Sequence, residues 1–294
     1  MAIDAAESGA WDALGAFLSG QALPVYIALL VVFAALELLL QVGEANPRAQ
    51  NAAQGIGSSS RRYLVNFGLP IIGMVLFAAL PLGSAGAALL AREHGWGLFN
   101  MVDMPAPLVL LAALTVRTLA MYWLHRIMHA VPVLWRVHRV HHTDPVLDVS
   151  TGLRHHPLEQ LLGAPVALAV VVALGLPVWA ALLTDAVLLA GALLKHLDGD
   201  LPKPVERWAA LVLATPTVHR LHHSAAVAET DSNFGNLVIV WDRLFGTFRD
   251  PAKGNPARLG LGDRFDPGAH DLWQQLQVGL RDPQAKPKSS EETV

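Results

Sequence analysis

Long apolar runs separated by polar segments dominate this 294-residue chain. Because about 20 apolar residues are needed to cross the hydrocarbon core of a bilayer, residues 24–42, 63–82 and 105–123 are candidate membrane spans. A longer run over residues 161–194 is interrupted near its middle by Gly175-Leu176-Pro177, which favours a helical hairpin with short halves. The pattern therefore predicts an all-α integral-membrane bundle of about four to five transmembrane or re-entrant helices.

The composition agrees with a bilayer environment. Hydrophobic residues make up 53% of the chain and charged residues 15%, against about 45–50% and about 25% in an average soluble domain. The formal net charge of −3 provides no basic excess for binding nucleic acid. The absence of cysteine excludes disulfides, thiolate nucleophiles and cysteine-ligated metal sites, so any metal ion must be held by histidine and carboxylate side chains.

The distribution of Lys and Arg orients the predicted spans, because these residues concentrate on the cytoplasmic side. Residues 1–47 contain neither type, whereas Arg48, Arg61 and Arg62 follow the first span. The N-terminus is therefore expected outside the cell, and the clustered histidines of the chain all reach the cytoplasmic side. We expect a multi-pass protein of the inner (cell) membrane with a histidine-rich helical cap in the cytoplasm.

This topology divides the chain into three expected regions. Residues 1–23 form an extracytoplasmic segment, residues 24–249 the membrane domain with its cap, and residues 250–294 a cytoplasmic segment. Within the last region, apolar residues recur at helical spacing over residues 269–280 and predict an interfacial helix. The charged, proline-containing tail over residues 281–294 is expected to be disordered.

Histidine is concentrated in one part of the chain, because 11 of the 13 histidines fall within residues 125–223. Eight of them form three boxes, namely His125 and His129; His138, His141 and His142; and His219, His222 and His223. Residues three or four positions apart share one face of a helix, and imidazole is the commonest metal-binding side chain. Since eight ligands exceed the ~3–4 protein ligands of a mononuclear zinc site, the boxes predict two metal ions. A pH-sensing cluster or a metal-transport path is the alternative interpretation.

Two further histidines are candidate ligands, because the predicted topology brings them to the cytoplasmic mouth of the bundle. His156 precedes the hairpin and His196 follows it. His155 is not expected to be a ligand, since adjacent side chains on a helix point about 100° apart. Arg154 and Glu159 are expected to form an ion pair that holds the turn around His156.

Several charged residues near these histidines also require an explanation. Glu37 and Asp185 lie inside predicted spans, where a carboxylate is either functional or buried with a polar partner. Four arginines lie among the boxes, namely Arg126, Arg136, Arg139 and Arg220. They are expected either to pair with nearby acids or to form a docking surface for an acidic electron donor. The candidate acids are Asp144, Glu159 and Asp242.

The boxes stand within an ordered series of motifs over residues 97–249. The series comprises Gly97-Leu-Phe-Asn100, Tyr122-Trp-Leu-His-Arg-Ile-Met-His129, Leu134-Trp-Arg-Val-His-Arg-Val-His-His142, Arg154-His-His-Pro-Leu-Glu159, Thr215-Pro-Thr-Val-His-Arg-Leu-His-His223, Thr230-Asp-Ser-Asn-Phe-Gly235 and Trp241-Asp-Arg-Leu-Phe-Gly-Thr247. In this order the motifs resemble the fatty acid hydroxylase/sterol desaturase superfamily of integral-membrane non-haem di-iron enzymes, in particular its bacterial sterol desaturase-like branch.

The resemblance implies that the eight box histidines ligate two iron ions, with His156 and His196 in family-like positions. With O2 as co-substrate, such a centre would hydroxylate or desaturate an unactivated C–H bond of a membrane lipid or fatty-acyl chain, and a sterol is the alternative substrate. The sequence shows no haem, flavin or dinucleotide motif. Electrons are therefore expected from a separate protein of the ferredoxin or cytochrome type.

Two positions depart from the pattern of the superfamily. Asp198 stands two residues after His196, where members of the bacterial branch often carry Asn. Thr118 stands four residues before Tyr122, where many members carry an acidic residue. Because the three boxes are intact, we still expect metal binding, whereas the departures bear on the substrate and the outcome of the reaction.

Overall fold

The computed structural model describes residues 5–41, 60–78, 83–254, 258–261, 269–278 and 280. Its elongated bundle contains the helices α1 (Ala5–Gly20), α2 (Ala22–Gln41), α4 (Ser60–Ala78), α5 (Ser84–Glu93), η1 (Leu98–Asn100), α6 (Ala106–Ala130), α8 (Pro157–Leu174) and α9 (Val178–Lys195). The remaining elements gather at one end of the bundle: α7 (Pro132–His142), η2 (Val149–Leu153), α10 (Lys203–Ala209), α11 (Pro216–His222), α12 (Val227–Thr230), α13 (Val240–Leu244), η3 (Pro251–Lys253) and α14 (Leu272–Val278). The described residues contain isolated β-bridges but no strand, so the all-α prediction is confirmed.

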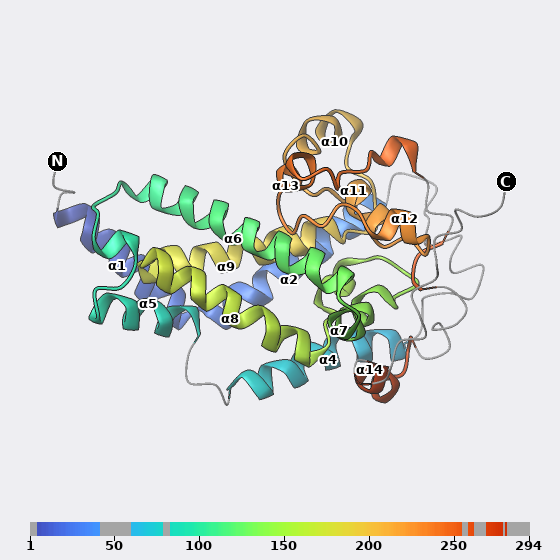
Figure 1. Ribbon diagram of the computed structural model, residues 1–294, viewed down its shortest axis with the longest axis horizontal. Helices are drawn as coiled ribbons and strands as arrows, with labels where there is room; N and C mark the ends of the chain where they lie inside the picture. The colour runs from blue at the N-terminus through green and yellow to red at the C-terminus, as the bar shows by residue number, and fades with distance from the viewer. Residues whose placement is uncertain are drawn as a thin grey trace.

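Four helices in the described part of the chain are long and apolar enough to cross a membrane: α2, α6, α8 and α9. Three of them, α6, α8 and α9, run along the long axis of the molecule in Figure 1. The run expected over residues 63–82 begins within α4, and its last four residues lie outside the described residues. The structure therefore confirms a membrane-type helical bundle with four candidate spans.

The turn of the α8–α9 hairpin forms where the sequence predicts it. Gly175 caps α8 in the left-handed conformation with φ 62°, and Pro177 caps the start of α9. A Cβ atom on Gly175 would lie 2.7 Å from the carbonyl oxygen of Trp96. Glycine is therefore required at position 175 for two reasons: the backbone has a positive φ, and a neighbouring loop approaches closely.

Small and aromatic side chains pack together at the end of the bundle that lies far from the histidines. Ala88, Val109, Ala113 and Leu176 belong to its buried core. Helix α1 packs along α9, and the Trp11 and Trp179 rings lie 4.6 Å apart. Residues 5–20 are thus a helix of the bundle, and the extracytoplasmic location expected for residues 1–23 remains a prediction.

Glu37 is a structural carboxylate that ties α2 to the histidine-rich end. Its side chain is buried, and its Oε2 accepts hydrogen bonds from the backbone N–H groups of Val149 at 2.8 Å and Asp198 at 3.0 Å. A buried backbone N–H that lacks an acceptor costs about 1–3 kcal/mol. Glu37 therefore supports the loops next to the histidines, and of the two interpretations of this acid the structure favours a buried acid with polar partners.

A buried ionic network lies beneath the histidine-rich end. The guanidinium of Arg62, fully buried on α4, donates to Asp144 at 2.7 Å and to Asp148 at 2.6 Å. Arg154 is equally buried and donates to Asn66, Thr143 and the carbonyl oxygens of Val140 and Ala269. The predicted pair of Arg154 with Glu159 is therefore wrong, because Arg154 points into this network while Glu159 faces the histidines.

The helix predicted over residues 269–280 is present in part as α14. Leu272 and Leu276 pack with Val65, Leu69 and Val140 from α4 and α7, whereas Trp273 is 68% exposed. The apolar face of α14 is therefore buried against the protein. Residues 279 and 281–294, including the tail expected to be disordered, lie outside the described residues.

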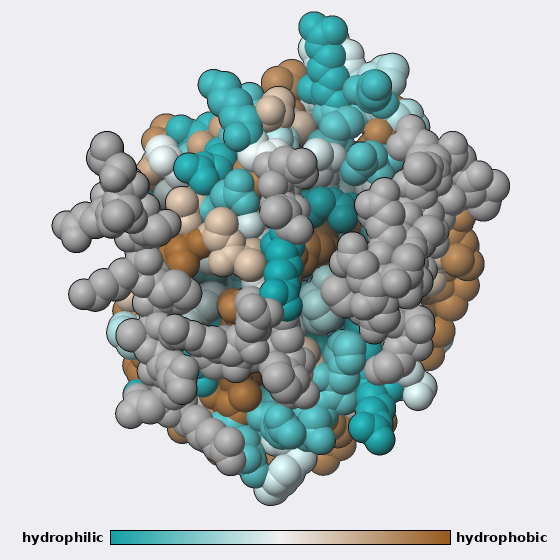
Figure 2. All heavy atoms as spheres, turned by 90° about the vertical axis from the view of Figure 1, so that its right-hand side faces the viewer, coloured by the Kyte–Doolittle hydropathy of each residue, from teal (hydrophilic) through white to brown (hydrophobic). Residues whose placement is uncertain are grey.

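The surface changes character between the sides of the bundle and its histidine-rich end. Large apolar side chains are exposed along the bundle, including Val31, Leu39, Ile71 and Leu111. Figure 2 looks onto the histidine-rich end and shows many hydrophilic residues in its described part, with smaller hydrophobic patches among them and more hydrophobic residues along the right-hand margin. An apolar belt with a polar end is the distribution that a protein embedded in a bilayer requires.

Candidate metal centre

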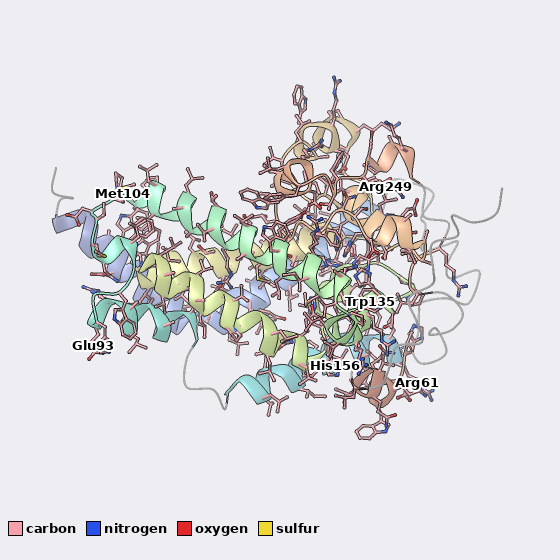
Figure 3. All side chains as sticks on the ribbon, in the orientation of Figure 1. Arg61, Glu93, Met104, Trp135, His156 and Arg249 are labelled. Carbon is pink, nitrogen blue, oxygen red and sulfur yellow. The ribbon has the colours of Figure 1, made fainter. Side chains whose placement is uncertain are left out.

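Three short helical segments and one helix end carry the clustered histidines. The first box occupies the last turns of α6, and the second lies on α7, which follows α6 after a one-residue break at Val131. The third box lies on α11 and at its C-cap, and His196 caps the C-terminus of α9. Figure 3 shows this end of the molecule around Trp135, whose ring lies 4.8 Å from that of His129.

The structure brings nine of the ten predicted ligands together, in two separate groups. One group consists of His125, His129, His138, His142 and His222, and the other of His141, His196, His219 and His223. Within each group, one ligand atom from every residue lies within 4.8 Å of the others. The boxes on α7 and α11 therefore contribute to both groups, which sequence spacing alone does not show.

The hydrogen bonds of the outer ring nitrogens fix the tautomers in the first group. His125 Nδ1 donates to the carbonyl oxygen of Phe234 at 2.7 Å, and His222 Nδ1 donates to that of Ser232 at 2.7 Å. His138 Nδ1 donates to Glu159 Oε1 at 2.8 Å. Since carbonyl and carboxylate oxygens only accept hydrogen bonds, each Nδ1 carries the proton and each Nε2 presents its lone pair.

These inward lone pairs face one another at short distances. His125 Nε2 lies 2.9 Å from His138 Nε2 and 3.1 Å from His222 Nε2. No hydrogen bond can form between two acceptors, so the arrangement is repulsive unless a cation lies between them. Nitrogen ligands about 2.1 Å from one ion and at right angles to each other lie about 3 Å apart. The first group therefore fits a metal ion.

The second group repeats this arrangement. His141 Nδ1 donates to the carbonyl oxygen of Arg154 at 3.3 Å and His196 Nδ1 to that of Ala192 at 2.6 Å, so both Nε2 atoms present lone pairs. These Nε2 atoms are 3.2 Å apart, and His219 Nε2 lies 3.1 Å from His196 Nε2. The second group fits a second metal ion by the same argument.

Burial keeps these imidazoles neutral. Desolvation first, and then the neighbouring imidazoles, hold the pKa of His141, His142 and His223 well below the ordinary value. For His196 and His219 burial again comes first, with the positive charge of Lys195 acting in the same direction on the pKa. Neutral imidazole is the form that ligates a metal, so these five side chains can bind a cation at neutral pH without losing protons.

Two carboxylates orient ligands from outside the groups. Glu159 accepts from both His138 and His155, and Asp231 accepts from His129 Nδ1 at 3.1 Å. Both acids lie within the motifs quoted above, but neither of these contacts was predicted from the sequence. The signal was their place inside motifs shared with a family of metalloenzymes.

Replacing Glu159 by Gln is expected to weaken metal binding by about 10–100-fold, because outer partners of ligating histidines set ring orientation and basicity. The measurement is the metal retained by purified protein titrated with a chelator. Glu93→Gln serves as the matched control, since Glu93 is exposed at the opposite end of the bundle (Figure 3). Equal metal retention by the two variants would contradict the role of Glu159.

His156 is the predicted ligand that the structure does not bring to either group. Its Nδ1 accepts the backbone N–H of Leu158 at 3.1 Å, so its Nε2 carries the proton and donates to the carbonyl oxygen of Leu276 at 3.1 Å. Both ring nitrogens are thus engaged, and the residue caps α8 next to α14. His156 therefore lies outside both groups and acts as a helix cap, and its neighbour His155 stacks on His141 with 4.6 Å between the rings.

The acids expected to pair with the arginines among the boxes have other partners. Asp144 binds Arg62, and Glu159 binds histidines. Asp242 accepts the backbone N–H groups of Phe234 and Gly235 at 2.7 and 2.8 Å. Asp242 thereby fixes the loop whose carbonyl oxygens orient His125 and His222, so the predicted pairing of these acids with Arg126, Arg136, Arg139 or Arg220 is wrong.

The part of the chain that carries the histidines matches a known protein family. Residues 110–247, which hold both histidine groups, match the sequence model of the family described as fatty acid hydroxylase. The chain is similar to the fatty acid hydroxylase family over this segment, which we name the hydroxylase domain. It contains every histidine of the two metal-binding groups, and the resemblance identified from the motifs is confirmed.

Relatives of the hydroxylase domain act on lipids, according to their names. The chain is 30% identical over 185 residues to ornithine lipid hydroxylase OlsE of Rhizobium tropici, covering 63% of this chain and 54% of that protein. It is 34% identical over 131 residues to alkylglycerol monooxygenase of Danio rerio and 32% identical to that of Homo sapiens, covering 43% of this chain and 27% of each relative. The chain thus spans about half or less of the length of these relatives. No solved structure matches it significantly.

The two departures from the superfamily pattern take part in local contacts near the hydroxylase site. Thr118 Oγ1 accepts a hydrogen bond from the indole N–H of Trp241 at 3.0 Å. The backbone N–H of Asp198 binds Glu37, and this contact anchors the chain two residues beyond His196. Both positions therefore support the elements that carry ligands.

A cavity of about 340 Å³ opens beside the two histidine groups of the hydroxylase domain. His125, His138, His141 and His196 form one part of its wall. The rest of the wall includes apolar side chains, among them Met121, Met128, Leu153, Leu188 and Leu189, and charged or amide side chains, namely Arg117, Glu159, Gln160, Asp185, Lys195 and Asn236. A cavity that combines apolar surface with placed polar groups is typical of a site for a small or elongated ligand.

Proposed function

We propose that this protein is a membrane-bound oxidoreductase that hydroxylates or desaturates a membrane lipid or fatty-acyl chain with O2. The observation that carries the proposal is the pair of adjacent groups of buried imidazoles, whose lone pairs converge beside a partly apolar cavity. The names of the relatives support a lipid substrate, since they include an ornithine lipid hydroxylase and alkylglycerol monooxygenases.

We infer that the two groups hold two iron ions. When bound, the iron centre would supply the O2-derived oxidising power needed to break an unactivated C–H bond. The choice of iron rests on the family match, because imidazole also suits zinc, copper and nickel.

The residues of the chain itself would position the substrate and exclude water. Met121, Leu188 and Leu189 give the cavity an apolar wall that favours a hydrocarbon chain at about 25 cal/mol per Å² of buried apolar surface. The buried hydrogen bonds from His125 and His138 to fixed oxygens hold these two rings at the edge of this cavity. The lipid would enter laterally from the bilayer between the helices.

The location of the protein in the cell and its electron-transfer partner are also part of this proposal. We infer that residues 24–249 form the catalytic membrane domain in the inner membrane, with the histidines on the cytoplasmic side. A separate ferredoxin or cytochrome-type protein would deliver electrons there. The positive-inside distribution of Lys and Arg supports this orientation.

The proposal is tested by comparing lipid extracts of cells with and without the expressed protein by mass spectrometry. Gain of one oxygen atom by a lipid class indicates hydroxylation, and loss of two hydrogen atoms indicates desaturation. The matched control is a variant with His138→Ala and His222→Ala, which should give neither product. Metal uptake into vesicles without any O2 consumption would instead identify a metal transporter.

A further inference from the structure

The cavity beside the histidines contains an ion pair that the proposed function does not use. Arg117 on α6 donates from Nη2 to Asp185 Oδ1 on α9 at 3.2 Å and from Nη1 to the carbonyl oxygen of Ala167 on α8 at 3.0 Å. Arg117 is only 9% exposed, whereas the Asp185 side chain is 37% exposed. Both residues line the same cavity as His125 and His196.

The ion pair lies far along the helices from the metal-binding nitrogens. Arg117 precedes His125 by eight residues on α6, and Asp185 precedes His196 by eleven residues along α9. At about 1.5 Å per residue, these separations correspond to about 12 Å and about 16 Å along the helix axes. Apolar side chains of Met121, Leu188 and Leu189 also line the cavity. The cavity therefore combines a metal-binding wall, apolar surface and a remote polar pair.

The ion pair keeps hydrogen-bonding capacity unused, because the five N–H groups of Arg117 make two hydrogen bonds to described residues and the Asp185 carboxylate accepts one. Arg117 Nε is buried and has no hydrogen-bonding partner within the described residues. Asp185 makes no hydrogen bond to a described residue other than the one from Arg117. The Asp185 carboxylate is 37% exposed and both residues line the cavity, so a ligand group in the cavity can hydrogen-bond to the pair.

The pair selects the chemical class of such a ligand. A hydroxyl or amide group can accept from Arg117 and donate to Asp185 at the same time. A hydrocarbon end would offer the pair no hydrogen bond, an anionic group would face the Asp185 carboxylate, and a cationic group would face Arg117. A neutral group with both a donor and an acceptor is therefore the best match.

We propose that Arg117 and Asp185 bind a hydroxyl or amide group of the substrate and thereby set the position of oxidation. The assignment of the reacting carbon rests on the proposed function, whereas the binding of the polar group does not. An extended hydrocarbon chain advances about 1.2 Å per bond, since the three backbone bonds of an extended amino-acid residue together span about 3.6 Å. The oxidised carbon is therefore expected about 10–13 bonds from the hydroxyl or amide.

The binding half of the proposal is tested without turnover. Tritium-labelled 1-dodecanol is displaced from the full chain in nanodiscs by unlabelled 1-dodecanol, dodecanamide or dodecane, with empty nanodiscs subtracted. We expect the alcohol, the amide or both to bind about 10–100-fold more tightly than the alkane. Preference for only one of them identifies the polar group, and no preference for either over dodecane overturns the proposal.

A double variant with Arg117→Met and Asp185→Leu is expected to lose this preference, because it presents no donor or acceptor. The matched control is Arg92→Met with Asp12→Leu, which removes an exposed pair 3.7 Å apart at the far end of the bundle. Retained preference in the Arg117/Asp185 variant would overturn the assignment. If that variant does not fold, the comparison of the three ligands on the unmodified protein still decides the question.

The position of oxidation provides a second measurement on active protein. In a series of longer 1-alkanols, the oxidised carbon is expected to stay at a constant number of bonds from the hydroxyl. A constant distance from the methyl end would show that the polar pair does not set the position. If the alkanols bind with the expected preference but no lipid or alkanol is oxidised, the proposed function fails while the binding site stands.

Discussion

Replacing His222 by Ala is expected to eliminate lipid oxidation and to remove the metal ion of the first histidine group. His222 Nε2 lies 3.1 Å from His125 Nε2, and its Nδ1 is fixed by the carbonyl oxygen of Ser232. Because loss of an outer partner alone costs about 10–100-fold in metal affinity or activity, loss of the ligand itself is expected to cost more. Metal analysis of the purified protein and lipid mass spectrometry measure the two effects.

The control for this substitution is His94→Ala, because His94 is exposed and stacks only on Trp96 among the aromatic rings of the described residues. This variant should keep both its metal and its products. The His222 variant should still bind metal in the second group, whose four histidines it leaves intact. Full metal content and full activity in the His222 variant would refute the assignment of the first group.

Replacing Arg62 by Met is expected to destabilise the fold by about 3–5 kcal/mol, because it leaves buried carboxylates without their countercharge. Arg62 makes charged hydrogen bonds to Asp144 and Asp148 under the histidine-rich end, where all three side chains are almost completely buried. The midpoint of thermal unfolding in detergent, compared between variants, measures the effect. Arg61→Met is the matched control, since the adjacent Arg61 is exposed.

The pH dependence of stability further distinguishes the Arg62→Met variant from the unmodified protein. Burial alone would raise the pKa of Asp144, but attraction to Arg62 and then Arg154 outweighs burial and lowers this pKa to about 2. The stabilisation from this carboxylate is therefore complete above its unfolded pKa of about 3.9 and is lost as the pH falls toward 2. Without Arg62 the pKa of Asp144 should rise, so the variant should lack the stability that the unmodified protein gains as the pH increases from about 2 to about 4. An identical pH profile for both proteins would contradict the network.

Local sequence patterns were sufficient to predict the helices and the histidine faces. The apolar runs of α2, α6, α8 and α9 and the turn at Gly175 all follow from length and from glycine and proline placement. The spacing within each box follows from the helical repeat, which places residues three and four positions apart on one face. These features depend on neighbours in the sequence, and the structure confirms them.

Contacts between distant residues could not be predicted in the same way. Arg154 was expected to bind Glu159, five residues away, but it binds Asn66 and Ala269 from other elements. His156 lies near the boxes in the sequence, yet the carbonyl oxygen of Leu276, 120 residues later, engages its Nε2. Which partner a buried polar group finds depends on all the groups that packing brings within about 3 Å of it.

The apolar runs and the histidine spacing alone predict a helical membrane protein whose candidate metal ligands are histidines. Only the tertiary structure decided how these histidines divide between two sites, because α7 and α11 each send side chains to both. It likewise decided that Glu37 supports loops while Arg117 and Asp185 line the cavity. The physical reason is that helical periodicity is local, whereas the grouping of ligands depends on the relative placement of helices that are far apart in the chain.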